Sequence, residues 1–150
     1  MRLRPINFLG LATLTAASTT AASPADFVKL PTSGPPTFMA THETTVGEFR
    51  AFVAATGHDA MGQMFTLGAD DYDWLPRGHT WIEPGFAQTD FHPVVGVNLA
   101  DARAYATWLT AKHHRDGSIP LTQAYRLPTD REWSLAAGLI NEPHSTPEAR

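Results

Sequence analysis

Apolar residues recur at helical spacing in three segments of the chain, and each segment begins with a capping sequence. In the first, Thr45 precedes Glu48 by three residues, and the apolar face consists of Val46, Phe49, Phe52 and Val53. Threonine and glutamate at this spacing form a capping box, in which each side chain binds the other's backbone N–H. The sequence therefore predicts a helix that starts after Thr45 and stops at Gly57, where glycine accepts a left-handed backbone.

Two further segments repeat this arrangement. Asn98 and Asp101 open a helix that we expect to reach about Lys112 and to continue through the basic residues 113–115. Its apolar stripe consists of Leu99, Ala102, Ala106 and Leu109, with Tyr105 beside it and Trp108 at its border. Thr129 and Glu132 open a third helix that ends near Gly138, with a stripe of Trp133, Ala136, Ala137 and Ile140.

Strand material is scarce. Short extended pieces are predicted at residues 27–30, 38–42 and 125–128, and a buried strand at 92–97. Residues 58–91, rich in Gly, Asp, Pro and aromatic residues, indicate a long irregular segment. Together these elements predict a loop-rich α+β fold with three helices and a few short strands. The strands are too few to cover the apolar stripes, so we expect the domain to be incomplete.

The first 22 residues have the pattern of a secretory signal peptide. Arg2 and Arg4 precede a mostly apolar stretch that ends in small residues at Ala21 and Ala22. We therefore expect an exported protein, periplasmic or secreted, with a signal peptide at 1–22, a linker at 23–36 and a domain at 37–150. A disordered N-terminal tail is the alternative. The apolar stretch is too short to span a bilayer, and no other segment is suited to do so.

Composition narrows the chemistry. The formal net charge is −4 without any basic run, so nucleic acid is not an expected partner. The chain contains no cysteine, which excludes disulfides, thiolate metal sites and cysteine nucleophiles. Its seven histidines lack metal-ligand spacing. Residues 70–73 resemble the start of a calcium loop, but Leu75 and Pro76 break the pattern, which favours a solvated acidic turn.

Several polar and aromatic residues have competing explanations. For the adjacent His113 and His114, a solvated helix end explains the pair better than a metal site. We expect His92 to be a structural hydrogen-bonding residue. We expect Arg126 to form a structural salt bridge with Glu43, Asp101 or Glu132 in preference to an acid–base pair. The aromatic loop around Trp74, Trp81 and Phe86 is either a binding platform for peptide or sugar, or a loop that covers the core with its own side chains.

Three motifs then follow one another along the chain. Residues 43–49 read ETTVGEF, residues 92–102 read HPVVGVNLADA, and residues 125–133 read YRLPTDREW. In this order they resemble the signature segments of the sulfatase-modifying factor family, the formylglycine-generating enzymes. The residues that carry the resemblance are Glu43, Thr45, His92, Pro93, Asn98, Asp101, Arg126, Pro128, Thr129, Glu132 and Trp133. The similarity extends from about residue 38 to residue 139.

The resemblance implies a C-type-lectin-like α+β fold and structural roles for the motif residues. Family members oxidise a cysteine of sulfatase substrates to formylglycine, using molecular oxygen and copper held by paired cysteines. The family's catalytic cysteines and most of its calcium ligands lie in a C-terminal half that we expect to be missing, so no catalytic or metal-binding residue carries over. Copper or calcium is expected only in a full-length member. Leu99, Ala106 and Ser134 replace the family's Trp, Cys and Glu, which indicates a divergent branch.

Two functions remain open from the sequence. The first is part of an oxidoreductase that converts a protein cysteine to formylglycine, inactive alone, with a protein or peptide substrate. The second is a non-catalytic, lectin-like module of the same fold that presents residues 74–91 to a ligand or protein. A cysteine pair downstream would favour the first.

Overall fold

The computed structural model describes residues 27–60, 62, 64–67, 74–76 and 78–139. The elements, in chain order, are β1 (Phe27–Lys29), β2 (Phe38–Ala40), α1 (Val46–Thr56), β3 (Phe65–Leu67), β4 (Trp74–Pro76), α2 (Leu99–Arg115) and α3 (Asp130–Ala136). The strands form two separate antiparallel pairs, with Val28 opposite Met39 and Thr66 opposite Leu75. The described residues therefore have a mixed α+β fold, as the pattern predicted.

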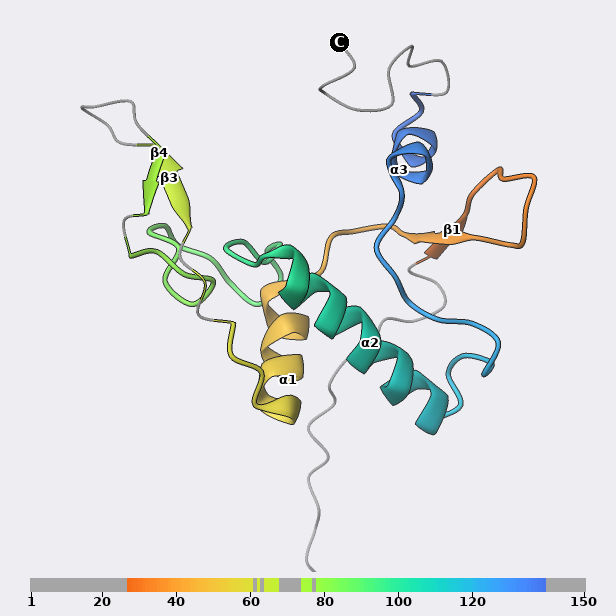
Figure 1. Ribbon diagram of the computed structural model, residues 1–150, viewed down its shortest axis with the longest axis horizontal. Helices are drawn as coiled ribbons and strands as arrows, with labels where there is room; N and C mark the ends of the chain where they lie inside the picture. Colours follow the sequence, from red (N-terminus) through yellow and green to blue (C-terminus); the bar gives the residue numbers. More distant parts are fainter. Residues whose placement is uncertain (1–26, 61, 63, 68–73, 77, 140–150) are drawn as a thin grey trace, which may run out of the picture.

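The core lies between α1 and α2, which cross each other in Figure 1. Phe49 and Phe52 of α1 are almost fully buried, and Trp81 packs against Phe49 in a T-shaped arrangement with the ring centroids 5.2 Å apart. From α2, Tyr105 and Trp108 place their rings 5.7 and 5.5 Å from Phe52. Five aromatic rings thus pack together in the core of the described residues, where the burial of their large apolar area is favourable.

All three predicted helix starts are confirmed. Reciprocal capping boxes join Thr45 to Glu48, Asn98 to Asp101, and Thr129 to Glu132. The end of α1 is also as predicted, because Gly57 adopts a left-handed backbone with φ +66° and its N–H binds the carbonyl of Val53. Caps depend only on residues a few positions apart, which makes them readable from sequence.

The predicted apolar stripe of α2 is wrong at its first position. Leu99 is 56% exposed, whereas Tyr105, predicted beside the stripe, and Trp108, predicted at its border, pack against the core. The buried side of α2 instead begins at Asp101 and continues through Tyr105 to Leu109. Two aromatic rings bury more apolar surface than two alanines can, and this difference sets the rotation of the helix about its axis.

The predicted strand at 92–97 is also wrong, and only an isolated bridge joins Thr45 to Pro93. The backbone of this segment binds residues that precede and begin α1, with Val46 N–H donating to His92 O and Val94 N–H to Thr44 O, both at 2.9 Å. Since the chain turns into a helix at Val46, the ladder cannot continue. The segment predicted as irregular, 58–91, in turn contains the β3–β4 pair.

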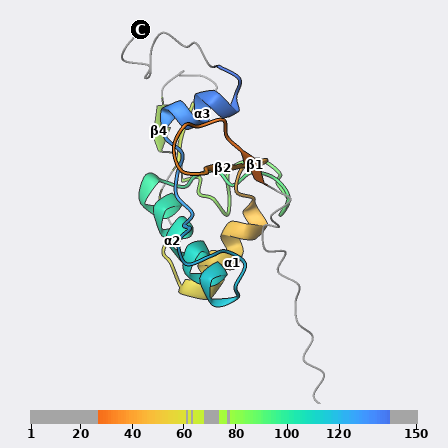
Figure 2. The same cartoon turned by 90° about the vertical axis from the view of Figure 1, so that its right-hand side faces the viewer.

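The periphery differs from the centre. Figure 2 shows the β1–β2 hairpin between α3 and the α1–α2 pair, and no residue of α3 is buried. Strand β1 falls within the segment 23–36 predicted as a linker, and Leu30 after it is buried. None of the described helices is long and apolar enough to cross a membrane. The predicted signal peptide and the acidic turn at 70–73 lie outside the described residues.

Candidate functional site

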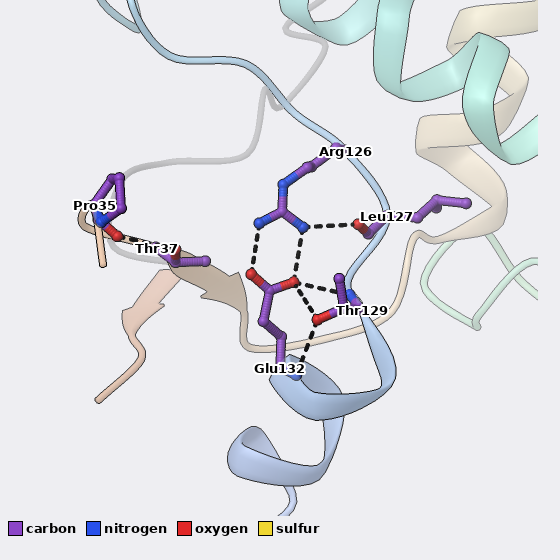
Figure 3. Close-up of polar contacts among 6 residues, drawn as sticks. All are labelled: Pro35, Thr37, Arg126, Leu127, Thr129 and Glu132. Atoms are coloured by element: carbon purple, nitrogen blue, oxygen red, sulfur yellow. Dashed lines mark hydrogen bonds and ion pairs between the residues drawn. The ribbon is translucent and has the colours of Figure 1, made fainter. Parts of the chain in front are cut away.

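A polar cluster surrounds Glu132 at the start of α3 (Figure 3). The Arg126 guanidinium donates two hydrogen bonds to the Glu132 carboxylate, at 2.7 and 2.5 Å. The same carboxylate accepts the Thr129 N–H at 2.8 Å and the Thr129 hydroxyl at 3.0 Å. The predicted salt bridge from Arg126 to one of three carboxylates is therefore confirmed, with Glu132 as the partner.

This cluster keeps Glu132 ionised. The hydrogen bonds from Arg126, followed by those from Thr129, lower the pKa of the Glu132 carboxyl to about 2. A carboxylate with so low a pKa, and with both oxygens engaged, is a poor proton acceptor near neutral pH. Trp133, the next residue, is 58% exposed. The hydrogen bonds of Glu132 to Arg126 and Thr129 therefore fix the backbone where the chain enters α3.

A second polar group joins the end of α1 to the start of α2. Asp101 is only 3% exposed, and one of its oxygens lies 2.8 Å from Nε2 of His58. Its other oxygen accepts the Asn98 N–H at 2.9 Å. The imidazole of His58 also packs against Phe52, with the ring centroids 5.0 Å apart. His58 was not among the predicted site residues, because its partner lies 43 positions away along the chain.

The third group lies at the start of α1, where the first two motifs meet. Thr45 caps the helix through Glu48 and also bridges to Pro93. The backbone N–H of Gly47 binds Asp90 O at 3.0 Å, and a Cβ at position 47 would lie 3.1 Å from Asp90. A side chain at position 47 would need Asp90 to move by a few tenths of an ångström, so glycine suits the close approach of the two segments. Glu43, the first residue of the motif, is exposed.

His92 makes the hydrogen bonds that we expected of it. Its Nδ1 accepts the Thr89 N–H at 2.7 Å and lies 3.1 Å from the Thr89 hydroxyl. Its carbonyl accepts the Val46 N–H, so the residue connects the turn at 89–92 to the first turn of α1.

The expectation of a solvated histidine pair at the end of α2 is wrong for His113. Its side chain is completely buried, and its Nδ1 lies 2.8 Å from the Tyr125 hydroxyl. Burial lowers the pKa of His113 from its ordinary value. His114, which is less buried, holds Gln123 O at 2.8 Å through Nε2. The cause is the path of residues 116–125, which fold back over the helix end.

The predicted aromatic loop is divided between core and surface. The Trp81 ring is 4% exposed and belongs to the core, whereas Phe86 is 58% exposed. The backbone of Trp74 forms the start of β4, and its side chain lies outside the described part of the structure. Near this region is an open, shallow pocket of about 310 Å³, lined by Gly62, Met64, Phe65, Gly96, Val97 and Asn98. The Asn98 side chain is already committed to the cap of α2.

The residues present do not fit a copper site built from paired thiolates. The chain contains no cysteine, and thiolates are the ligands that select Cu(I). Within the described ranges, no three His, Asp or Glu side chains come together as metal ligands would. The three motif carboxylates at the helix starts are instead engaged by backbone N–H groups and by neighbouring side chains.

Comparison with known proteins supports the motif resemblance. The family model of the sulfatase-modifying factor enzyme 1-like domain matches residues 10–143. The formylglycine-generating enzyme of Streptomyces coelicolor is 33% identical over 117 residues, which cover 62% of this chain and 33% of that enzyme. The enzyme of the same name from Thermomonospora curvata is 30% identical over 121 residues, with 60% of this chain and 33% of that enzyme covered.

A second group of relatives has a different name. The serine/threonine-protein kinase pkn1 of Chlamydia pneumoniae is 30% identical over 103 residues, which cover 67% of this chain but only 14% of the kinase. The chain thus spans about a third of the length of the formylglycine-generating enzymes it matches, and about a seventh of the kinase. No solved structure matches.

Proposed function

The chain belongs to the sulfatase-modifying factor family, and from that premise we propose that it is a formylglycine-generating-enzyme-like protein whose residues 27–139 serve as scaffold. Two observations support this proposal. Each of the three family motifs caps the N-terminus of a helix, at Thr45, Asn98 and Thr129, and the chain has no thiol. The motif carboxylates are occupied with capping, so their role is to hold backbone segments together. They are not arranged for proton transfer.

The proposed relation to an oxidoreductase has a direct chemical consequence. Conversion of a cysteine side chain to the formylglycine aldehyde in this family depends, by the resemblance, on copper held by paired cysteines. When bound, copper would supply the redox chemistry through which the substrate thiol reacts with oxygen. Because these 150 residues contain no cysteine, such a site needs thiolates from outside them.

An activity assay tests the proposal. The purified chain is incubated with a cysteine-containing sulfatase peptide, copper and oxygen, and the peptide is analysed by mass spectrometry for the aldehyde. The expected result is unchanged peptide, with a formylglycine-generating enzyme such as that of Streptomyces coelicolor as the positive control. Formation of the aldehyde by the chain alone would contradict the scaffold role.

A second function, a non-catalytic ligand- or protein-binding module, is favoured by a separate observation. Large apolar side chains are exposed in β3, in α3 and in the connection between β4 and α2, including Phe65, Phe86, Phe91 and Trp133. A contiguous exposed apolar patch is typical of a binding face, and these side chains are the candidates for one. The match to a small part of a protein kinase is consistent with a module carried on other proteins. If the chain binds the same sulfatase peptide without converting it, and Phe86→Ser abolishes this binding, the result would favour the binding module.

Two further features of the proposal concern architecture and location. The short antiparallel strand pairs, the crossed helices and the long connections support a C-type-lectin-like fold, which an experimental structure would test by superposition on known lectin domains.

The basic, apolar and small-residue pattern of residues 1–22 supports export. N-terminal sequencing of protein recovered from a bacterial periplasm should begin at Ser23, and recovery only with Met1 in the cytoplasm would contradict export.

A further inference from the structure

The segment between α2 and α3 is held to the end of α2 by a small set of side-chain contacts. The Tyr125 N–H donates to the Thr110 hydroxyl at 2.9 Å. The Tyr125 hydroxyl lies 2.8 Å from Nδ1 of His113, and its ring meets the His113 ring at 71° with centroids 5.3 Å apart. Tyr125 also touches Phe27 of β1, with centroids 5.8 Å apart. Tyr125 is therefore the residue through which α2, β1 and the third motif are connected.

His113 is the buried member of this connection. Its side chain has no solvent exposure, and its Nε2 has no hydrogen-bond partner among the described residues. The backbone carbonyl of His113 accepts the N–H groups of Ser118 and Ile119, at 2.9 and 3.3 Å, so the turn that covers the ring is anchored to the same residue. In the protonated ring both nitrogens carry an N–H group, of which the one on Nε2 has no acceptor among the described residues, and the added positive charge is buried, which is costly.

We propose that His113 is an acid-sensitive latch, whose protonation releases residues 116–125 from the end of α2 and so frees the motif at 125–133. This inference does not depend on the proposed function. In the closed form the imidazole is buried with no described partner at Nε2, which favours its neutral form, and opening exposes the ring to water, where the charged form is stabilised. Acid therefore shifts the equilibrium towards the open form.

The charged groups around the ring agree with this direction. Burial is the main reason why the pKa of His113 is lowered, and the neighbouring Lys112 ammonium lowers it further. Asp116 opposes the shift, but it does not titrate in the same range, because hydrogen bonds from Ser118 hold the pKa of its carboxyl at about 2. Tyr125 stays protonated, since burial raises the pKa of its phenol. Of His113, Asp116 and Tyr125, the imidazole is therefore the group that titrates between neutral and mildly acidic pH.

Nuclear magnetic resonance on the intact chain tests the latch. The chemical shifts of the His113 ring are followed from pH 8 to pH 4, together with the exchange protection of the Tyr125 amide, corrected for intrinsic exchange. We expect His113 to titrate below the ordinary histidine value. The opening constant reported by Tyr125 should rise as the pH falls below that value, by at most about tenfold per pH unit, the limit for uptake of one proton.

Two variants isolate the cause. His114→Gln is the matched control, because His114 is adjacent and also holds the segment, and the pH response should persist in it. Tyr125→Phe keeps the ring contacts but removes the hydroxyl, so the protection of residue 125 should already fall at pH 8. The proposal is overturned if wild-type His113 titrates at its ordinary value, or if protection at Tyr125 does not change with pH. Both observations need only the wild-type chain.

Discussion

The start of α1 and the start of α3 use the same local device with different surroundings. Thr45 with Glu48 and Thr129 with Glu132 form capping boxes of nearly identical geometry, with N–H···O distances of 2.8 Å to the glutamate in both. Yet α1 buries Val46, Phe49 and Phe52, whereas no residue of α3 is buried. A cap therefore sets where a helix begins, but packing decides whether the helix takes part in the cooperative core.

The largest expected contrast comes from removing one ring in each region. Phe49→Ala should lower the free energy of unfolding by about 3–5 kcal/mol, the usual cost for a buried phenylalanine. Trp133→Ala should change it by less than about 0.5 kcal/mol, as for other exposed positions. Urea denaturation followed by fluorescence and circular dichroism measures both. Similar losses for the two variants would mean that α3 is packed as tightly as α1.

The motif carboxylates give the next largest contrast. Asp101→Ala leaves the Asn98 N–H and the His58 ring without their partner in a buried site. We expect this variant to lower the free energy of unfolding by about 2 kcal/mol. Glu132→Ala breaks a cluster whose arginine is half exposed. It should therefore lower the free energy of unfolding by at most about 1 kcal/mol. His58→Ala is the control that removes only one of the Asp101 contacts. Its free energy of unfolding should lie between those of the wild type and of Asp101→Ala.

Equivalent cap deletions should separate global from local stability. Thr45→Ala should lower the global free energy of unfolding by about 1 kcal/mol, the typical value of an N-cap. Thr129→Ala should leave global unfolding unchanged and raise only the exchange rates of the α3 amides, because α3 is not part of the core. Equal shifts of the denaturation midpoint in both variants would contradict this separation.

The smallest expected effect is a pH response confined to α3. The pKa of Glu132 falls from 4.5 to about 2 in the folded chain, mainly through Arg126. A carboxyl whose pKa is lowered on folding stabilises the structure above pH 4.5, and this contribution is lost as the pH falls from 4.5 to about 2. The amide signals of α3 should report this loss. Glu132→Gln should abolish the response, and a response that persists in this variant would assign it to another group.

Features that depend on neighbouring residues were readable from the sequence. All three helix starts and the Gly57 stop involve residues a few positions apart or a single glycine conformation. The sequence also predicted a salt bridge of Arg126 but left three carboxylates open, and the structure selects Glu132, six positions away. The orientation of α2 was not readable, because the choice between an alanine–leucine stripe and the Tyr105–Trp108 side depends on what the helix packs against. The three-residue strands β3 and β4 are too short to show a period.

Contacts between distant segments were also missed. His58 meets Asp101 across 43 positions, and the buried His113 meets Tyr125, which the chain brings back to the end of α2. Trp81 illustrates a different ambiguity, since a tryptophan in an irregular segment can bind a ligand or fill a core, and composition does not distinguish the two. In each case the missing information is the path of the chain in space, which local propensity does not contain.

Residue-resolved amide hydrogen exchange measures the difference between the two regions most directly. If α1 and α2 form the cooperative core and α3 is held only by its cap and a few contacts, the slowest amides of α1 and α2 should exchange with the free energy of global unfolding. The amides of α3 should exchange through local opening with a much smaller free energy. Exchange of α3 with the same free energy as α1, and with the same dependence on urea, would contradict the account.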